Sequence, residues 1–138
     1  MDKLTNIFDV SARAMSAQMM RLNTVASNLA NSRSIYTNPE DAYRAIKPVF
    51  ETIYADKAAK SGIASVNVQS FVRVEREPTA EYRPDDPKAN EEGYVYAAAV
   101  DTDEEMVEML DASRNFQNNI EVVSTLKALM IRTINLGK

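Results

Sequence analysis

The sequence predicts an α+β fold in which long N- and C-terminal helices form a coiled coil and a small β-containing domain is inserted between them. Three observations lead to this prediction. Apolar residues recur every seven positions in residues 1–32 and again in residues 101–138, as in helices that pack side by side. All five prolines and two of the three glycines lie in residues 33–100. Part of that middle segment also alternates with the period of two that is typical of strands.

The first expected helix, an N-terminal axial helix within residues 1–32, contains neither glycine nor proline. Its apolar positions form a heptad seam. The seam consists of Phe8, Met15, Leu22 and Leu29, the first three followed four residues later by Ala12, Met19 and Ala26. At 1.5 Å per residue such a helix is about 40 Å long, which exceeds the length of an average globular helix.

The stretch LNTVASNLAN, residues 22–31, places three asparagines in this helix. Asparagine is a poor helix former because its amide competes with the backbone for hydrogen bonds. Asn31 could simply end the helix, and Asn23 could face solvent. We favour a contact surface, in which Ala26 and Ala30 let a neighbouring helix approach and the amides of Asn28 and Asn31 set the register.

The second expected helix, a C-terminal axial helix, occupies residues 101–138. Thr102 and Glu105 have the spacing of a capping box, acidic residues follow it, and Gly137 is expected to end the helix. Its apolar stripe consists of Met109, Phe116, Val123 and Met130 at intervals of seven, with Leu126, Ile120 and Ile134 widening it. Arg114 is a lone cation beyond the acidic turns, for which an intrahelical pair with Asp111 or Asn118 is the simplest interpretation.

The middle segment, residues 33–100, is expected to form the small β-containing outer domain. Valines at even positions predict a strand over Val66–Val74, and Lys47–Tyr54 and Tyr94–Val100 are weaker strand candidates. The acidic, proline-bearing stretch 75–93, which includes Asp85 and Asp86, is expected to be a solvated loop or an exposed hairpin extension.

The composition argues against most kinds of active site. The chain of 138 residues has no histidine, cysteine or tryptophan, and its three glycines are scattered, so we expect no catalytic, cofactor-binding or metal-binding residues. A net charge of -4 argues against a nucleic-acid partner. The longest apolar runs are far below the roughly 18 residues of a membrane-spanning helix, and no cleaved signal peptide is expected.

Both apolar stripes are wider than a two-helix hairpin can cover. The helices could pair inside one globule, but apolar surface left in water costs about 25 cal/mol per Å². Neighbouring chains are therefore the expected cover, through self-association or assembly into a larger coiled-coil array.

Five segments carry a resemblance to a known family: LNTVASNLANS, AYRAIKPVF, ANEEGYV, AVDTDEEMVEMLDASRNFQNNIEV and LKALMIRTINLGK. Together they resemble the bacterial flagellar basal-body rod proteins, and the combination of the last three is similar to a member from the proximal rod. The chain departs from the family pattern at two junctions. It has no glycine pair before Tyr43 and Arg44, and Ala98 and Ala99 stand where the family usually has Pro-Asn.

The resemblance implies a structural subunit without catalytic activity. It implies export through the flagellar type III apparatus without a cleaved signal peptide, and assembly with other rod proteins and the rod-to-ring adaptor into a tubular drive shaft that crosses the periplasm. The terminal helices would form the inner coiled-coil layer. The expected assembly interface comprises Phe8, Met15, Leu22, Val25, Ala26, Asn28, Leu29, Ala30, Asn31, Met109, Arg114, Phe116, Asn119, Ile120, Val123, Leu126 and Met130.

Two other classes of protein stay open. A cytoplasmic coiled-coil adaptor or export chaperone would share the heptads and the acidic pI, but it has no need for a proline-rich β insert. A small β-domain enzyme would need a polar constellation in residues 45–100, and that segment lacks one.

Overall fold

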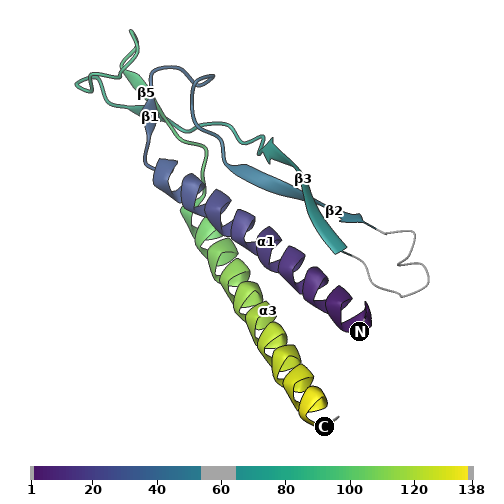
Figure 1. The fold of residues 1–138 in the computed structure, drawn as a ribbon. Coiled ribbons are helices and arrows are strands. Elements are labelled where there is room, and N and C mark those ends of the chain that lie inside the picture. Colours follow the sequence, from purple (N-terminus) through teal and green to yellow (C-terminus); the bar gives the residue numbers. More distant parts are fainter. Residues whose placement is uncertain (1, 54–64, 137–138) are drawn as a thin grey trace.

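The computed structural model describes residues 2–53 and 65–136 (Figure 1). The chain forms two helices and five strands in this part. In chain order these are α1 (Asp2–Asn31), β1 (Ile35–Tyr36), β2 (Ile46–Ile53), β3 (Ser65–Arg73), β4 (Ala80–Tyr82), β5 (Tyr94–Ala97) and α3 (Thr102–Leu136). The two terminal helices and the small antiparallel sheets confirm the predicted α+β class.

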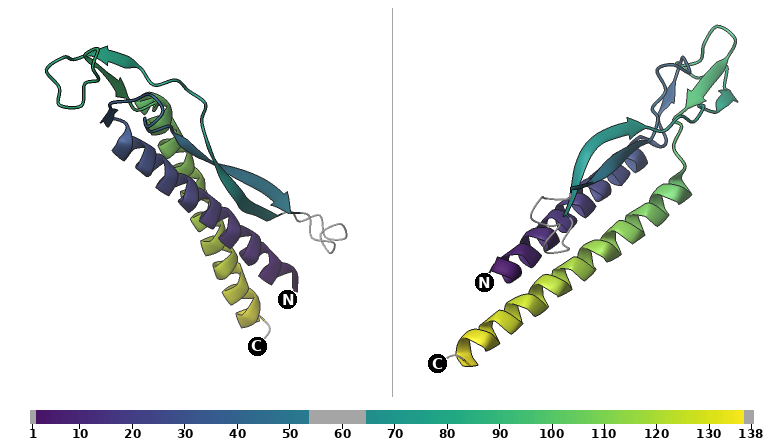
Figure 2. Two further views of the ribbon diagram at one scale, coloured as in Figure 1. Left: turned by 90° about the horizontal axis from the view of Figure 1, so that it is seen from above. Right: turned by 90° about the vertical axis from the view of Figure 1, so that its right-hand side faces the viewer.

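The two helices lie side by side and run in opposite directions, with both chain ends at the same end of the molecule (Figures 1 and 2). β2 and β3 form an antiparallel ribbon with a register shift between Val49 and Phe50. This ribbon contacts α1 on a side that α3 leaves open. α1 is therefore the central element, covered by α3 and by the ribbon.

A second sheet lies beyond the end of α1, where α3 begins (Figure 1). Its strand order is β1-β5-β4, and all pairs are antiparallel. The turn between β4 and β5 uses Gly93 at a φ of 83°, a left-handed conformation that glycine adopts at little cost. The two sheets are joined through the backbone, because the Ala99 N–H donates to the Tyr43 carbonyl and the Val74 N–H donates to the Ala45 carbonyl.

The helices and the three expected strands all form, although β5 ends earlier, at Ala97. β1 and β4 were not predicted, because strands of two and three residues are too short to show a period. The stretch 75–93 contains β4, which pairs with β5, and the turn that connects these two strands. The side chains of Val66 and Val68, the end of the predicted strand at Tyr54 and the helix stop at Gly137 lie outside the described residues.

The helix start differs from the predicted capping box. The Asp101 carboxylate accepts hydrogen bonds from the N–H groups of Asp103 and Glu104, at 3.1 and 3.2 Å, so Asp101 is the N-cap and Thr102 is the first helical residue. The prediction was one residue late, because both Asp101 and Thr102 are good caps and the sequence alone does not rank them. Glu105 is consequently free of a capping role, and it points into the molecule instead.

The buried apolar residues in the described part are all small. They are Ala17, Val25, Ala42, Ala45, Val95, Ala98, Ala99 and Ala112. Small side chains let the helices and the base of the second sheet approach closely, but they bury little apolar area. The stability of the isolated chain therefore depends on few contacts.

Candidate assembly interface

A line of covered residues runs along α3 at alternating intervals of four and three. The line consists of Glu105, Met109, Ala112, Phe116, Asn119, Val123, Leu126 and Met130, all buried or half-buried. This spacing keeps the side chains on one helix face. Because α1 is the helix that packs along α3, the line faces α1. In the single chain, the predicted apolar stripe of α3 therefore packs against α1 of the same chain.

Three residues expected in or near that stripe lie outside it. Ile120 is 46% exposed and Ile134 is 61% exposed, so they do not widen the covered face. Arg114 is exposed as well, and among the described residues no hydrogen bond or ion pair joins it to Asp111 or Asn118; Asp111 instead accepts hydrogen bonds from Arg21 and Asn115. These side chains are directed to solvent in the single chain.

On α1 the seam residues at intervals of seven are half-buried, as predicted. The second set of seam residues was predicted one position too far along the helix. Phe8, Met15, Leu22 and Leu29 are half-buried as expected. Ala12, Met19 and Ala26, four residues further, are exposed. The covered companions lie three residues further instead, at Ser11 and Val25. The reason is that the β2-β3 ribbon and α3 cover adjoining sides of α1, which a pattern of apolar residues alone does not locate.

Asn28 holds the start of β2 against α1. Its side chain is 1% exposed. Its amide nitrogen donates to the Ile46 carbonyl at 2.9 Å, and its amide oxygen accepts from the Ile46 N–H and the Tyr43 hydroxyl, both at 2.9 Å. The amide therefore pairs with backbone as a neighbouring strand would. The expectation that it would find its partner in a neighbouring helix is wrong, since its own chain supplies the partners.

The rest of the LNTVASNLAN surface remains open to other molecules. Asn31 is the last residue of α1, and its amide donates to the Ser27 carbonyl at 2.8 Å, which is a local helix-end contact. Ala26 and Ala30 are exposed, so a close approach of a helix over these small residues stays a prediction. Asn23 is exposed, as the simpler interpretation of that residue expected.

Two clusters of ion pairs attach α3 to its neighbours. Arg21 of α1 donates from Nε to Glu108 at 2.9 Å and from Nη1 to Asp111 at 3.1 Å. Lys47 of β2 donates to Glu104, and Arg76 donates to the same carboxylate at 3.1 Å. The hydrogen bond from Lys47, assisted by Arg76, lowers the pKa of Glu104. The same hydrogen bond raises the pKa of Lys47.

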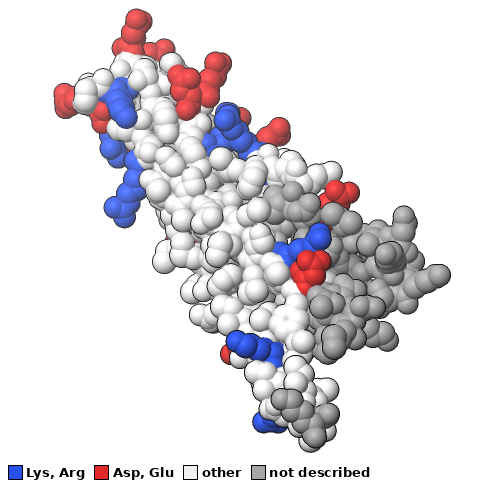
Figure 3. Space-filling model, in the orientation of Figure 1, with Lys and Arg blue, Asp and Glu red and all other residues white. Residues whose placement is uncertain are grey.

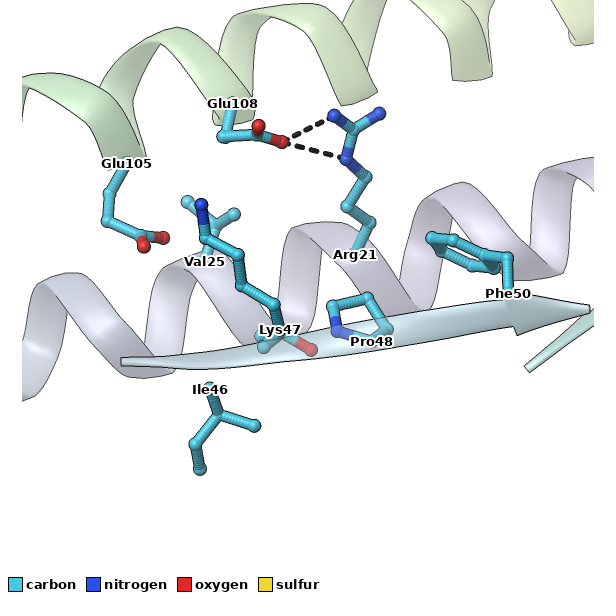
Figure 4. Close-up of a pocket in the computed structure, with 9 residues that line it drawn as sticks. Arg21, Val25, Ile46, Lys47, Pro48, Phe50, Glu105 and Glu108 are labelled. Atoms are coloured by element: carbon cyan, nitrogen blue, oxygen red, sulfur yellow. Dashed lines mark hydrogen bonds and ion pairs between the residues drawn. The ribbon is translucent and has the colours of Figure 1, made fainter. Parts of the chain in front are cut away.

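A hollow of about 340 Å³ lies where α1, α3 and β2 meet (Figure 4). Val25, Pro48 and Phe50 form apolar parts of its wall, and Arg21 reaches across it to Glu108. Glu105 also lines it and is only 2% exposed. Burial raises the pKa of the Glu105 carboxyl above its usual range. The hollow thus contains a buried carboxyl group beside paired charges. These contacts fix the positions of α1, α3 and β2 relative to one another.

Sequence reasoning missed the residues that make these attachments. Arg21, Tyr43, Lys47 and Arg76 carried no expectation as contacts of the helices. Each pairs with a residue at least 15 positions away in the chain, and no local period reports such a pairing. The one available signal was the complementary charge of the two helices, with acidic turns at residues 101–111 and the arginines Arg13 and Arg21 in the first helix.

The described part of the chain offers no group of three or more acidic residues placed to hold a metal ion. Within the same residues, neither helix has an apolar stretch long enough to cross a bilayer.

Comparison with known proteins decides the family. Residues 8–32 match the family model for flagella basal body rod proteins, and residues 91–136 match that for the C-terminal part of the flagellar basal body rod FlgEFG proteins. The flagellar basal-body rod protein FlgC of Escherichia coli O6:H1 is 40% identical over 135 residues, covering 98% of both chains. The chain belongs to the FlgC family. FlgC of Salmonella typhimurium is also 40% identical over 98% of both chains, and that of Aquifex aeolicus is 35% identical over 96% of both.

The FlgC relatives align through the middle segment as well as the helices, since the matches span nearly the whole chain. The family resemblance stated from the sequence motifs is thereby confirmed.

Proposed function

We propose that this FlgC-family chain is a structural subunit of the proximal part of the flagellar rod and that it assembles into a tubular shaft through α1 and α3. In the assembled state the helices form an inner coiled-coil layer, and residues 33–100 form the outer domain. The other rod proteins and the rod-to-ring adaptor are the expected partners. No catalytic step is assigned to the chain.

One observation carries the proposal: large apolar side chains along both helices are exposed to solvent in the single chain. The exposed ones on the helices are Met19, Met20, Met106, Val107, Leu110, Ile120, Val122, Leu129, Ile131, Ile134 and Leu136. Figure 3 shows that the middle of the face in view is largely uncharged. Each such side chain contributes about 1.5–3 kcal/mol when it is fully buried, so association with further subunits is strongly favoured.

The attachments between the helices and the insert support the same assignment. Asn28 binds β2 to α1, and the cluster of Lys47, Arg76 and Glu104 binds the ribbon to α3. Helices that pack into a shaft would therefore carry the β segments with them in a defined orientation. A transmission element needs this property, because torque applied to the inner layer must reach the outer one.

We further propose that the chain reaches the periplasmic rod through the flagellar type III export apparatus, in an unfolded state. A fold with small buried residues and few strongly stabilising contacts costs little free energy to unfold before export. The absence of cysteine from the sequence agrees with passage into an oxidising compartment.

The test is complementation of a bacterium whose own FlgC is deleted. The parent chain is expected in purified basal bodies and restores swimming. Val122→Asp changes an exposed residue of α3, so the free chain keeps its fold while assembly is reduced. Glu92→Ala, in the exposed β4-β5 turn, is the control and is expected to behave as the parent.

A chain that stays in the cytoplasm bound to another export substrate would contradict the proposal and favour the adaptor or export chaperone. Normal swimming with Val122→Asp would show that the exposed apolar surface of α3 is not an assembly surface.

A further inference from the structure

The first turn of α3 buries a carboxyl group that has no ion-pair partner. Glu105 is 2% exposed, and it is the one charged residue among the buried side chains of the described part. Among the ion pairs between described residues, none includes Glu105. Burial removes the water that stabilises a carboxylate, so a charged and unpaired Glu105 destabilises the fold. An apolar side chain of similar size would stabilise the fold more.

The two cations that line the same hollow are engaged elsewhere. Arg21 of α1 binds Glu108, and Lys47 of β2 binds Glu104. Figure 4 shows the Arg21 guanidinium directed at Glu108 and not at Glu105. Each positive charge is thus matched by a carboxylate other than that of Glu105, and the negative charge of Glu105 is left over.

The groups that face Glu105 act on its charge in both directions. Burial is the largest influence and raises the pKa of the Glu105 carboxyl. The Asn28 amide of α1 and the Lys47 ammonium of β2 favour the charged form, whereas Glu104 and Glu108 of α3 disfavour it. The docked helix therefore favours the neutral carboxyl group, and an opened helix places Glu105 in water, where the charged form is stable at neutral pH.

The position of Glu105 couples this charge to the opening of the molecule. The hollow of about 340 Å³ lies where α1, α3 and β2 meet, so water reaches Glu105 when the first turn of α3 moves away from β2. That movement breaks the ion pairs of Lys47 and Arg76 with Glu104. These pairs are partly exposed, and such pairs contribute little stability. Opening at this point also uncovers the end of the molecule where most buried residues lie.

We propose that Glu105 is a proton-controlled switch that keeps the chain easy to unfold in the cytoplasm before export. At neutral pH the carboxyl group gains solvation by leaving the hollow, so opening of α3 is favoured. At lower pH the carboxyl group retains its proton and α3 stays docked. This inference rests on the proposed export of the unfolded chain, and it adds the residue that sets the rate of unfolding and its dependence on pH.

Unfolding rates of the purified full-length chain in urea, measured by stopped flow from pH 4 to 8, test the switch. Glu105→Gln keeps the size of the side chain and removes its charge. It is expected to unfold at least about fivefold more slowly than the parent at pH 7.5 and at the parent's rate at pH 4. Glu105→Met, an uncharged residue of similar length, is a second variant with the same expected result.

Export is measured in bacteria whose own FlgC is deleted, as the fraction of the chain found outside the cytoplasm after a fixed time. Glu105→Gln is expected to lower that fraction at least about threefold, because slow unfolding delays entry into the export apparatus. Adding Val95→Ala, which removes buried methyl groups from β5 and speeds unfolding, is expected to restore export.

Asp103→Asn is the matched control. It removes the same charge from an exposed position in the same turn of α3, and it is expected to unfold and to be exported as the parent is. A change of net charge alone is thereby separated from the burial of Glu105.

A Glu105→Gln chain that unfolds as fast as the parent at pH 7.5, or faster, overturns the inference. So does a slowly unfolding variant that is exported normally. A parent chain that never leaves the cytoplasm contradicts the proposed export and the role of the switch together. The two failures are distinguished because only the second affects the parent.

Discussion

At the scale of single residues, Asn28 shows how one polar side chain organises the molecule. Asparagine is unfavourable in the interior of a helix, so its position is explained only by contacts outside the helix. Its amide replaces a strand partner for Ile46 and also accepts a hydrogen bond from the Tyr43 hydroxyl. A fully buried amide with three hydrogen bonds attaches β2 to α1 at one defined register.

We expect Asn28→Leu to destabilise the free chain by about 2–4 kcal/mol, since the buried N–H and carbonyl of Ile46 would lose their partners. Leucine is the better helix former, so the loss would not come from α1 itself. Urea unfolding measures the change, with Asn23→Leu on the exposed side of α1 as the matched control. Equal stability of the two variants would show that the β2 attachment contributes little.

At the scale of elements, the first turn of α3 contains two neighbouring acidic residues whose pKa values shift in opposite directions. Glu104 is half-buried and pairs with Lys47 and Arg76, which lowers its pKa. Its neighbour Glu105 is buried beside the hollow, which raises its pKa. One turn of helix thus contains a carboxylate that favours docking of α3 in its charged form and one that favours docking in its neutral form.

The two glutamates are expected to change the pH dependence of stability with opposite sign. Glu105 has a folded-state pKa above its unfolded value, so its favourable contribution is complete below the unfolded pKa and is lost as pH rises through the folded pKa. Glu105→Gln should therefore raise stability at pH 7 relative to the parent, and the gain should vanish toward about pH 4.

Glu104→Gln is the matched comparison. The lowered pKa of Glu104 means that its contribution is present above the unfolded pKa and is lost as pH falls through the folded pKa. The substitution should cost less than about 1 kcal/mol at pH 7, because the pair is partly exposed to solvent, and nothing at low pH. Urea unfolding from pH 3 to 8 measures both slopes. Parallel pH profiles for the two variants would contradict these assignments.

At the scale of the whole molecule, the stabilising contacts gather where the helices meet the β segments. Asn28, Glu105 and Ala112 are buried near that end, together with the alanines at the base of the second sheet. Toward the chain ends α3 retains only half-buried contacts, and its last turns project past α1. The single chain is therefore anchored at one end, and the last turns of α3 have little cover at the other.

We expect this asymmetry to appear in hydrogen exchange of the dilute monomer. Amides in residues 122–136 of α3 should exchange faster than those in residues 105–116, and β5 should be among the most protected segments. Helices with uncovered apolar faces obtain most of their stability from packing, so assembly should slow exchange in residues 122–136. Uniform protection along α3 in the monomer would mean that the helix needs no further partner.

Much of the covered face of α3 could be anticipated from periodicity. Met109, Phe116, Val123, Leu126 and Met130 lie in one covered line because spacings of three and four residues select a single face of any helix. The corresponding forecast on α1 failed for Ala12, Met19 and Ala26, which are exposed. A helix with two neighbours has two covered sides, and the direction of the second neighbour depends on where the chain returns.

The sequence by itself determined the two long helices, the longer strands between them and the resemblance to rod proteins. These features depend on local spacing, on caps near residue 101 and on the placement of proline, all of which act over a few residues. Only the tertiary structure decided that Asn28 binds β2 rather than a neighbouring helix, that Arg21 pairs with Glu108, and that α3 outreaches α1. Those contacts join residues far apart in the chain, so they exist only once the backbone has brought the segments together.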